Sequence, residues 1–362
     1  MKVKRRYPIC RRSFRVAATA ACLLALPAAA ADKAPAPFVP VLRENFPDAF
    51  ILRHGTSFYA YATNADQGRA NLQMATSPDL VNWTLLRDAR DPKRLHDAMP
   101  TLAPWAKESF TWAPEVMETG GKFVVYFTAR ERRSDLQCIG AATATTPSGP
   151  FVSTAAEPLV CQRDLGGTID AHPYRDADGQ LYLYYKNDGN NPKFLETARI
   201  WGQRLSPDGL RLLGEAAPLV SADKHWEWRV VEAPTMVRRA ATGGANAYTL
   251  FFSANHFGWE DDQRLSNYGI GYASCRGPMG PCEDAPANPL LTSRMGAAGC
   301  ISGPGHQAVF DVGGRQFMAY HAWDATAGCR KRSHARHMYI SPLRWDDGKP
   351  EVRMTLRPAG AK

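Results

Sequence analysis

Residues 178–187 read DGQLYLYYKN, a tight-turn signal followed directly by an aromatic-rich run. Asp-Gly before such a run is typical of a β-hairpin turn that enters a strand. The same pattern returns four more times, as HGTSFYAYAT from His54, GGKFVVYFTA from Gly120, GANAYTLFFS from Gly244 and GGRQFMAYHA from Gly313. Five copies of one hairpin strand indicate an internal repeat.

A further strand follows each hairpin, and we expect it to end in a polar turn that contains proline. These prolines are Pro78, Pro147, Pro207, Pro278 and Pro342, and they lie 69, 60, 71 and 64 residues apart. Units of this length, with several short strands and almost no helical pattern, are typical of propeller blades. The sequence therefore predicts an all-β fold, a five-bladed β-propeller. A β-sandwich has no reason to repeat so long a unit five times, and a β-helix has far shorter coils.

The N-terminal segment has the three parts of an export signal. A basic head precedes an apolar run from Val16, and small residues follow at Ala28–Ala31. The pair Arg11-Arg12 fits either a twin-arginine motif or chance. We expect residues 1–31 to be an export signal. Residues 32–362 should be one catalytic propeller domain, because no linker composition divides that part of the chain.

Most of the positive charge belongs to this leader. The whole chain has 44 Lys+Arg against 35 Asp+Glu, and removal of seven basic leader residues leaves 37 against 35. A near-neutral mature protein gives no support for general attraction to nucleic acid or to a membrane surface. We therefore expect a soluble, exported protein, periplasmic or extracellular, with neither of these as a partner.

Six cysteines lie beyond the leader, and an even number in an exported protein indicates disulfide bonds. Short separations favour the pairs Cys138–Cys161, Cys275–Cys282 and Cys300–Cys329, although six cysteines allow fifteen pairings. None of them has the spacing of metal ligands.

The residue at the start of each unit's first strand is chemically distinctive. These residues are Asp48 in DAFIL, Trp112 in WAPEV, Asp170 in DAHPY, Glu232 in EAPTM and His306 in HQAVF. First strands line the axis of a propeller, so equivalent positions converge at one end of the channel. We expect three carboxylates, an indole and an imidazole in one pocket. Glu115, three places after Trp112, should point away from it.

Three carboxylates in one pocket disfavour each other's ionisation, so at least one should keep its proton. Glycoside hydrolysis needs such an acid together with an ionised carboxylate. Trp112 would add a flat wall for a sugar face, and Arg294 either grips a sugar hydroxyl or is a surface arginine. Taken singly, Asp48, Asp170 and His306 also fit purely structural roles in turns and loops.

Five segments in this order resemble glycoside hydrolase family 43: NFPDAFIL, TWAPEV, TIDAHPYRDADGQLYL, VVEAPTM and GPGHQAVF. The resemblance implies an exported, inverting propeller enzyme that acts on arabinose- or xylose-containing polysaccharides. It implies that Asp48 is the general base, Glu232 the general acid, and Asp170 the third acid that raises the pKa of Glu232 and orients it. His306 matches a channel histidine that in some relatives helps to hold calcium or another ion. We expect no cofactor and no metal mechanism, and at most one structural ion near His306.

Further segments, QCIGAA, GGTIDAHPY and KNDGN among them, resemble the arabinan-directed members. The leading hypothesis is removal of terminal α-1,5-linked L-arabinofuranose from plant cell-wall arabinan or its oligosaccharides. A β-xylosidase, an endo-arabinanase and a non-catalytic sugar-binding propeller stay open as alternatives, although lectin-like propellers tend to repeat one site in every blade. The insert Arg87–Lys107 with Trp105, and the loop of Trp226 and Trp228, should shape the pocket mouth.

Overall fold

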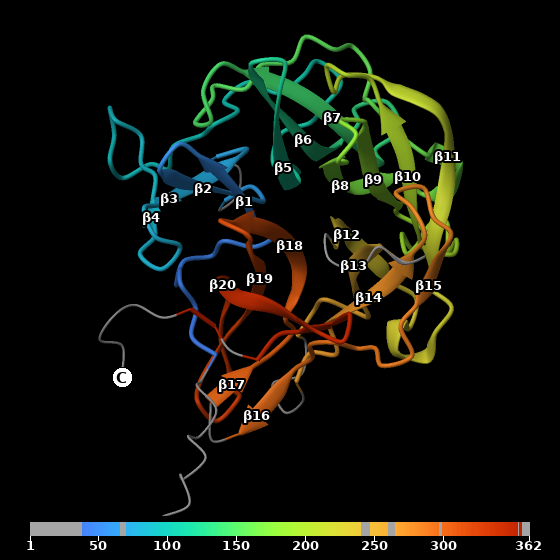
Figure 1. Cartoon of the computed structure of the whole chain (residues 1–362). Coiled ribbons are helices and arrows are strands. Elements are labelled where there is room, and N and C mark those ends of the chain that lie inside the picture. The colour runs from blue at the N-terminus through green and yellow to red at the C-terminus, as the bar shows by residue number, and fades with distance from the viewer. Residues whose placement is uncertain are drawn as a thin grey trace, which may run out of the picture. The chain divides into compact units, whose positions relative to one another are not determined.

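Five antiparallel sheets follow one another along the chain and stand around a ring, as the change of colour in Figure 1 shows. Four sheets have four strands and one has three. The five-bladed β-propeller predicted from the repeats is therefore confirmed. This is a computed structural model, and it describes residues 38–65, 70–239, 247–259, 265–296, 299–353 and 355–356. The expected export signal, residues 1–31, lies outside the described residues.

Each blade is a meander of strands that are consecutive in the chain. Blade 1 contains β1 (Phe50–His54), β2 (Ser57–Ala62), β3 (Gln73–Ser77) and β4 (Thr84–Leu85). Blade 2 contains β5 (Trp112–Thr119), β6 (Lys122–Arg130) and β7 (Gln137–Ala144). Blade 3 contains β8 (Thr168–Arg175), β9 (Leu181–Asn187), β10 (Arg199–Leu205) and β11 (Leu212–Ser221). Blade 4 contains β12 (Val231–Arg238), β13 (Tyr248–Ala254), β14 (Gly269–Cys275) and β15 (Cys282–Asp284). Blade 5 contains β18 (Gly305–Val312), β19 (Arg315–Ala325), β20 (Lys331–Asp346) and β21 (Lys349–Glu351), and the hairpin of β16 (Arg294–Gly296) and β17 (Gly299–Ile301) precedes it.

Helical structure among the described residues is limited to two short 3₁₀ turns, η2 (Arg163–Leu165) and η3 (His225–Glu227). No helix in the described ranges is long and apolar enough to cross a bilayer. The site is therefore built by strand ends and the loops that join them.

The aromatic-rich strands become the buried second strand of each blade. All seven residues of β9 are buried, and the turn before it bends at Gly179, whose φ of 85° suits glycine. Tyrosines in these strands also join neighbouring blades. The hydroxyls of Tyr61, Tyr126 and Tyr184 donate to the backbone carbonyls of Pro147, Gly209 and Pro278 in the next blade, at 2.7, 2.7 and 2.8 Å. The hairpin tyrosines and the proline turns thus recur together because each pair holds two blades together.

One proline does not follow the expected pattern. Pro78, Pro147, Pro207 and Pro278 lie in turns after a blade's third strand, but Pro342 lies inside β20, paired with Phe317 of β19. The outer strand β21 pairs only with Arg344–Asp346, so Pro342 needs no N–H for an outer partner.

The three disulfides favoured by their short separations are the three that form. Cys138–Cys161 joins β7 to the segment after it, Cys275–Cys282 joins β14 to β15, and Cys300–Cys329 joins β17 to the turn between β19 and β20. The first and third tie peripheral chain to a blade, and the second joins the two outer strands of blade 4.

Candidate functional site

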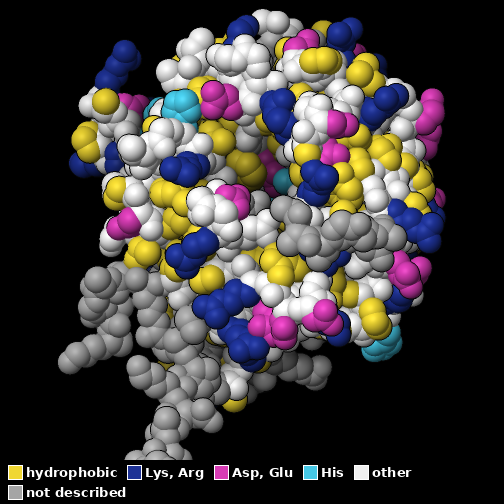
Figure 2. All heavy atoms as spheres, in the orientation of Figure 1, with side chains coloured by type: hydrophobic (Ala, Val, Ile, Leu, Met, Phe, Trp, Pro, Cys, Tyr) yellow, Lys and Arg dark blue, Asp and Glu magenta, His cyan; other side chains and the backbone are white. Residues whose placement is uncertain are grey.

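A pocket of about 570 Å³ lies where the first strands converge. Its walls include all five residues of the predicted column: Asp48, Trp112, Asp170, Glu232 and His306. Figure 2 shows a hollow near the centre of this face, with acidic and histidine side chains inside it. Glu115 is not part of the wall, and its carboxylate contacts the ring of His172 at 2.6 Å.

The structure does not bring Arg294 to this pocket. Arg294 lies on the hairpin that precedes blade 5, and its guanidinium is 4.2 Å from the ring centre of Phe38. The sequence placed Arg294 near the site because it directly precedes the last blade. Arg294 instead pairs with Ile301 in the hairpin of β16 and β17 and lines neither the first nor the second pocket.

Two members of the column are one residue out of register with the others. Each blade has one non-glycine residue with positive φ in its first strand or, for Asp48, just before it: Asp48 (60°), Ala113 (45°), Asp170 (59°), Ala233 (51°) and His306 (49°). Four of these strands change register there, as at a β-bulge. Ala113 and Ala233 are therefore the true equivalents of Asp48, and Trp112 and Glu232 come one position earlier. Sequence alignment matched Glu-Ala to Asp-Ala and could not detect this shift.

The bulges are held by a cycle of hydrogen bonds between blades. A buried polar residue lies opposite each positive-φ residue, on the second strand in four blades and just after it in blade 1: Thr128, Lys186, Ser253 and His321, and Thr63. Four of these accept the backbone N–H of the positive-φ residue in the next blade: Ala113 to Thr63 (2.9 Å), Asp170 to Thr128 (3.2 Å), His306 to Ser253 (2.7 Å) and Asp48 to His321 Nδ1 (3.2 Å). Non-glycine residues with positive φ are strained, and these contacts explain how the strain is sustained.

Lys186 is the exception in this cycle, because an ammonium cannot accept a hydrogen bond. The N–H of Ala233 therefore donates to Oδ2 of Asp170, at 3.0 Å. The Lys186 ammonium instead contacts Oε2 of Glu232 at 3.0 Å and donates to Oδ1 of Asn190 at 2.6 Å. Because Lys186 replaces a hydrogen-bond acceptor, Asp170 accepts the backbone N–H beside Glu232, and Lys186 pairs with the Glu232 carboxylate.

Asp48 is held as a carboxylate. Its Oδ1 lies 3.2 Å from the Arg336 guanidinium and 3.5 Å from the His306 ring, and its Oδ2 accepts the Thr63 hydroxyl. Burial opposes ionisation, but the positive charges of Arg336 and His306 outweigh it and hold the Asp48 pKa well below its usual value. Asp48 is therefore ionised across the ordinary pH range.

Burial and neighbouring charges shift the pKa values of Asp170 and Glu232 in opposite directions. Burial, with the charge of Glu232 added, raises the pKa of Asp170 to about 6. Burial also opposes ionisation of Glu232, but the Lys186 ammonium and the Tyr268 hydroxyl, 2.7 Å from Oε1, lower its pKa overall. The net shift of the Glu232 pKa is thus downward, opposite in direction to the effect expected from Asp170, because these two partners outweigh burial. The two carboxyls titrate as a coupled pair, and burial together with the charge of Glu232 favours the protonated form of Asp170.

His306 supplies a positive charge among these acids. Burial favours its neutral form, but Asp48, Asp170 and Glu232 together raise its pKa. The three predicted carboxyls thus face His306, Lys186 and Arg336, and the pocket wall also includes Asp135, Asp188 and Arg130.

Several wall residues were not identified from the sequence, and Lys186, Tyr268 and Arg336 among them contact the predicted carboxyls. Lys186 had a usable signal, since it is the only charged residue of the β9 segment LYLYYKN. Tyr268 and Arg336 had none, because they lie just before β14 and within β20, far along the chain from the column residues that they face.

A second pocket of about 320 Å³ shares Asn190, Pro192, Glu232 and Phe257 with the first. Trp228, 58% exposed, lies on its wall, as expected for the pocket mouth. The other expected mouth residues do not line either pocket. Trp226 packs against Phe252, Trp105 is buried and stacks on Phe127, and no residue of the insert 87–107 lines either pocket. Residues 98–106 of the insert pack into the core shared by blades 1 and 2, which their tryptophan and alanines favour.

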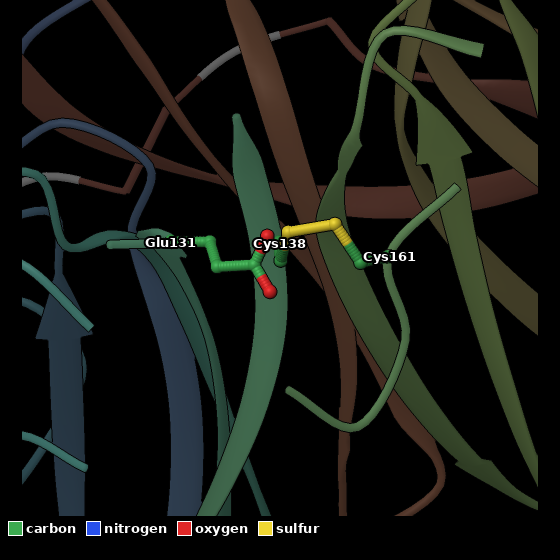
Figure 3. Close-up of side chains that lie close together, drawn as sticks. All are labelled: Glu131, Cys138 and Cys161. Atoms are coloured by element: carbon green, nitrogen blue, oxygen red, sulfur yellow. A yellow bond between two sulfur atoms is a disulfide. The ribbon is translucent and has the colours of Figure 1, made fainter. Parts of the chain in front are cut away.

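Two groups of metal-ligand side chains occur among the described residues, and His306 belongs to neither. The first, in Figure 3, is Glu131 with Cys138 and Cys161. Both sulfurs are bonded to each other, so neither is a thiolate, and Glu131 forms an ion pair with Arg163. The second group is Asp223, Glu227 and Asp284, away from the pocket.

Comparison with known proteins decides the family. The family model described as glycosyl hydrolases family 43 matches residues 39–350. The chain belongs to glycosyl hydrolase family 43. A crystal structure of a thermostable family-43 glycoside hydrolase superposes with a TM-score of 0.71 at 29% identity, covering 88% of this chain and 95% of that one.

Relatives with named activities differ in substrate. A β-D-galactofuranosidase of Aspergillus niger is 28% identical, over 68% of this chain and 64% of that enzyme, just under two thirds of its length. An extracellular exo-α-(1→5)-L-arabinofuranosidase of Cellvibrio japonicus is 22% identical, over 84% of this chain and 85% of that enzyme. An extracellular endo-α-(1→5)-L-arabinanase of Bacillus subtilis is 24% identical, over 70% of this chain and 53% of that enzyme. Family membership makes this protein a glycoside hydrolase but does not select the sugar.

Proposed function

We propose that this family 43 protein is an exo-acting α-L-arabinofuranosidase that removes terminal α-1,5-linked L-arabinofuranose from arabinan or arabino-oligosaccharides. The observation that carries the proposal is the position of Glu232, which lies on the walls of both pockets. A sugar in the 570 Å³ pocket would have its glycosidic oxygen beside Glu232, and the next sugar would occupy the 320 Å³ pocket.

In the proposed mechanism Asp48 takes a proton from a water molecule, and the water oxygen forms its bond to the anomeric carbon. The bond to the leaving oxygen breaks on the opposite face, and Glu232 gives that oxygen its proton. The proton comes from the Asp170–Glu232 pair, which acts as one titrating unit. Arg336 and His306 keep Asp48 ionised, and displacement from the opposite face inverts the anomeric centre.

Furanose preference is supported by two relatives whose names specify furanosidases, one of which covers most of both chains. A second candidate is hydrolysis of β-D-galactofuranosides, which the 28% identity to the Aspergillus niger enzyme favours. The β-D-galactofuranose ring has the configuration of α-L-arabinofuranose with a longer exocyclic chain. The same pocket could therefore be chemically suited to both, and only a substrate comparison separates them.

Action outside the cytoplasm is part of the proposal. Its support is the three disulfides together with the extracellular relatives from Cellvibrio japonicus and Bacillus subtilis. Disulfides persist in oxidising compartments and are rare in a reducing cytosol.

Product analysis tests the substrate. We expect the purified protein to release free arabinose from linear α-1,5-arabino-oligosaccharides, one residue at a time, and no xylose from β-1,4-xylo-oligosaccharides. The first-formed anomer, followed by NMR, should be inverted. Release of arabinobiose or longer fragments would replace the exo assignment with an endo one, and galactofuranose release alone would favour the second candidate. Absence of any sugar product would return a non-catalytic sugar-binding protein to consideration.

Lys186 should set the alkaline limit of activity. In the wild type, kcat/KM should fall as pH rises through about 6, because the Asp170–Glu232 pair then loses its proton. Lys186→Met removes the cation that lowers both pKa values, so this limb should move to higher pH. Lys186→Arg keeps the charge and should keep the wild-type limb, and Lys122→Met, an exposed site on β6, is the surface control. A limb that stays in place or moves to lower pH in Lys186→Met would contradict the assignment.

A further inference from the structure

Three carboxyl groups meet on the outer side of blade 4, away from the pocket. Asp223 precedes η3, Glu227 ends η3, and Asp284 ends the outermost strand β15. One oxygen of each lies within 4.8 Å of the others. The chain separation of Asp284 from the other two means that the fold itself brings them together.

Glu227 is fully buried and points one oxygen into this cluster without a donor. Its Oε2 accepts the backbone N–H groups of Asp223 and Lys224, at 3.0 and 2.9 Å. Its Oε1 has no hydrogen-bond donor among the described residues, and neither has Oδ1 of Asp284. A buried carboxylate oxygen without a donor is costly, so such oxygens need a proton or a cation.

Positive charge near the cluster is limited. The Lys224 ammonium lies 2.6 Å from Asp223, but both side chains are more than half exposed, so their pairing is weak. Burial is the main cause that raises the pKa of Glu227 to about 7 and that of Asp284 to about 6. The negative charge of the cluster is thus incompletely balanced by the protein.

We propose that Asp223, Glu227 and Asp284 form a binding site for one calcium ion. All donors are carboxylate oxygens, which hard cations prefer, and water would complete the coordination. Their irregular arrangement on a loop, a 3₁₀ turn and a strand suits Ca²⁺, which accepts flexible geometry, better than Mg²⁺, which requires a near-ideal octahedron.

The proposed ion would connect the loop before β12 to the edge of blade 4. The backbone carbonyl of Glu227 accepts the N–H groups of Val230 and Asn255, at 3.0 and 3.2 Å. Both of these residues line the second pocket. Calcium at Glu227 would therefore stabilise the wall where the leaving sugar is proposed to lie.

Thermal unfolding with and without calcium tests the site. After treatment with EGTA, CaCl₂ about 100-fold above Kd should raise the wild-type Tm by about 5 °C. Asp284→Asn should abolish that increase. Glu283→Gln is the matched control, because it removes the same charge from the adjacent, exposed position of β15 and should keep the full increase.

Isothermal titration with CaCl₂ should give one site in the wild type and in Glu283→Gln, and none in Asp284→Asn or in the exposed variant Asp223→Asn. A wild type whose Tm and heat of titration do not respond to calcium would overturn the proposal, and a proton shared by Glu227 and Asp284 would then satisfy their oxygens. Equal responses in Asp284→Asn and Glu283→Gln would overturn it as well. Because the readouts are Tm and heat, their failure is distinguishable from failure of the proposed activity.

Discussion

Glu232→Gln is expected to lower kcat for arabino-oligosaccharides by about 10²–10⁴-fold, the usual contribution of a positioned general acid. Glutamine is close in size and can still contact Lys186 and Tyr268, which hold the native carboxyl at 3.0 and 2.7 Å. It has no acidic proton to give to the leaving oxygen. The loss should therefore appear mainly in kcat, with KM little changed.

The leaving group distinguishes this role from a structural one. A 4-nitrophenyl α-L-arabinofuranoside has a leaving group that departs without protonation, so the loss in Glu232→Gln should be far smaller on that substrate. Glu118→Gln, an exposed glutamate of β5, is the matched control and should retain wild-type rates on both substrates. Equal losses on the two substrates, or full activity on the oligosaccharide, would remove Glu232 from the role of acid.

The propeller was readable from the sequence because its blades repeat a strong local signal. Hairpin turns, buried aromatic strands and prolines recur in every unit, and the tyrosine-to-carbonyl contacts show why these features occur together. Pro342 departed from the pattern because β20 continues through it. The repeat predicts which strands form, but it does not predict the residue at which a strand ends.

The site was only partly readable for a different reason. Acidic and aromatic residues at the blade starts can be identified directly from the sequence, so Asp48, Asp170 and Glu232 could be named. The β-bulge that places Glu232 one position before the true equivalent of Asp48 is a backbone feature, and no residue type in the sequence marks it. Charges such as Lys186 and Arg336 act across strands and blades, so their effect on the Glu232 and Asp48 pKa values needs three-dimensional contacts.

Asp48→Asn is expected to cause a loss of about 10²–10⁴-fold in kcat, and this loss should be the same for activated and natural leaving groups. The reason is that Asp48 acts on the water molecule, whose attack is required whatever group departs. Asparagine retains the shape that Thr63, Arg336 and His306 surround. It cannot take a proton from water, so the attacking oxygen stays a weak nucleophile.

Azide provides a direct check on this interpretation, because it is an anion that needs no base. Added to Asp48→Asn with the 4-nitrophenyl substrate, it should restore turnover and give a glycosyl azide of inverted configuration, detected by NMR. Azide should not rescue Glu232→Gln on oligosaccharides, since the missing proton there concerns the leaving oxygen. An azide product of retained configuration would mean that a nucleophile other than Asp48 attacks first, and the separation of roles between Asp48 and Glu232 would then be wrong. Inverted product in one variant and no rescue in the other would place the base and the acid on opposite faces of the bound sugar, which is the arrangement that inversion requires.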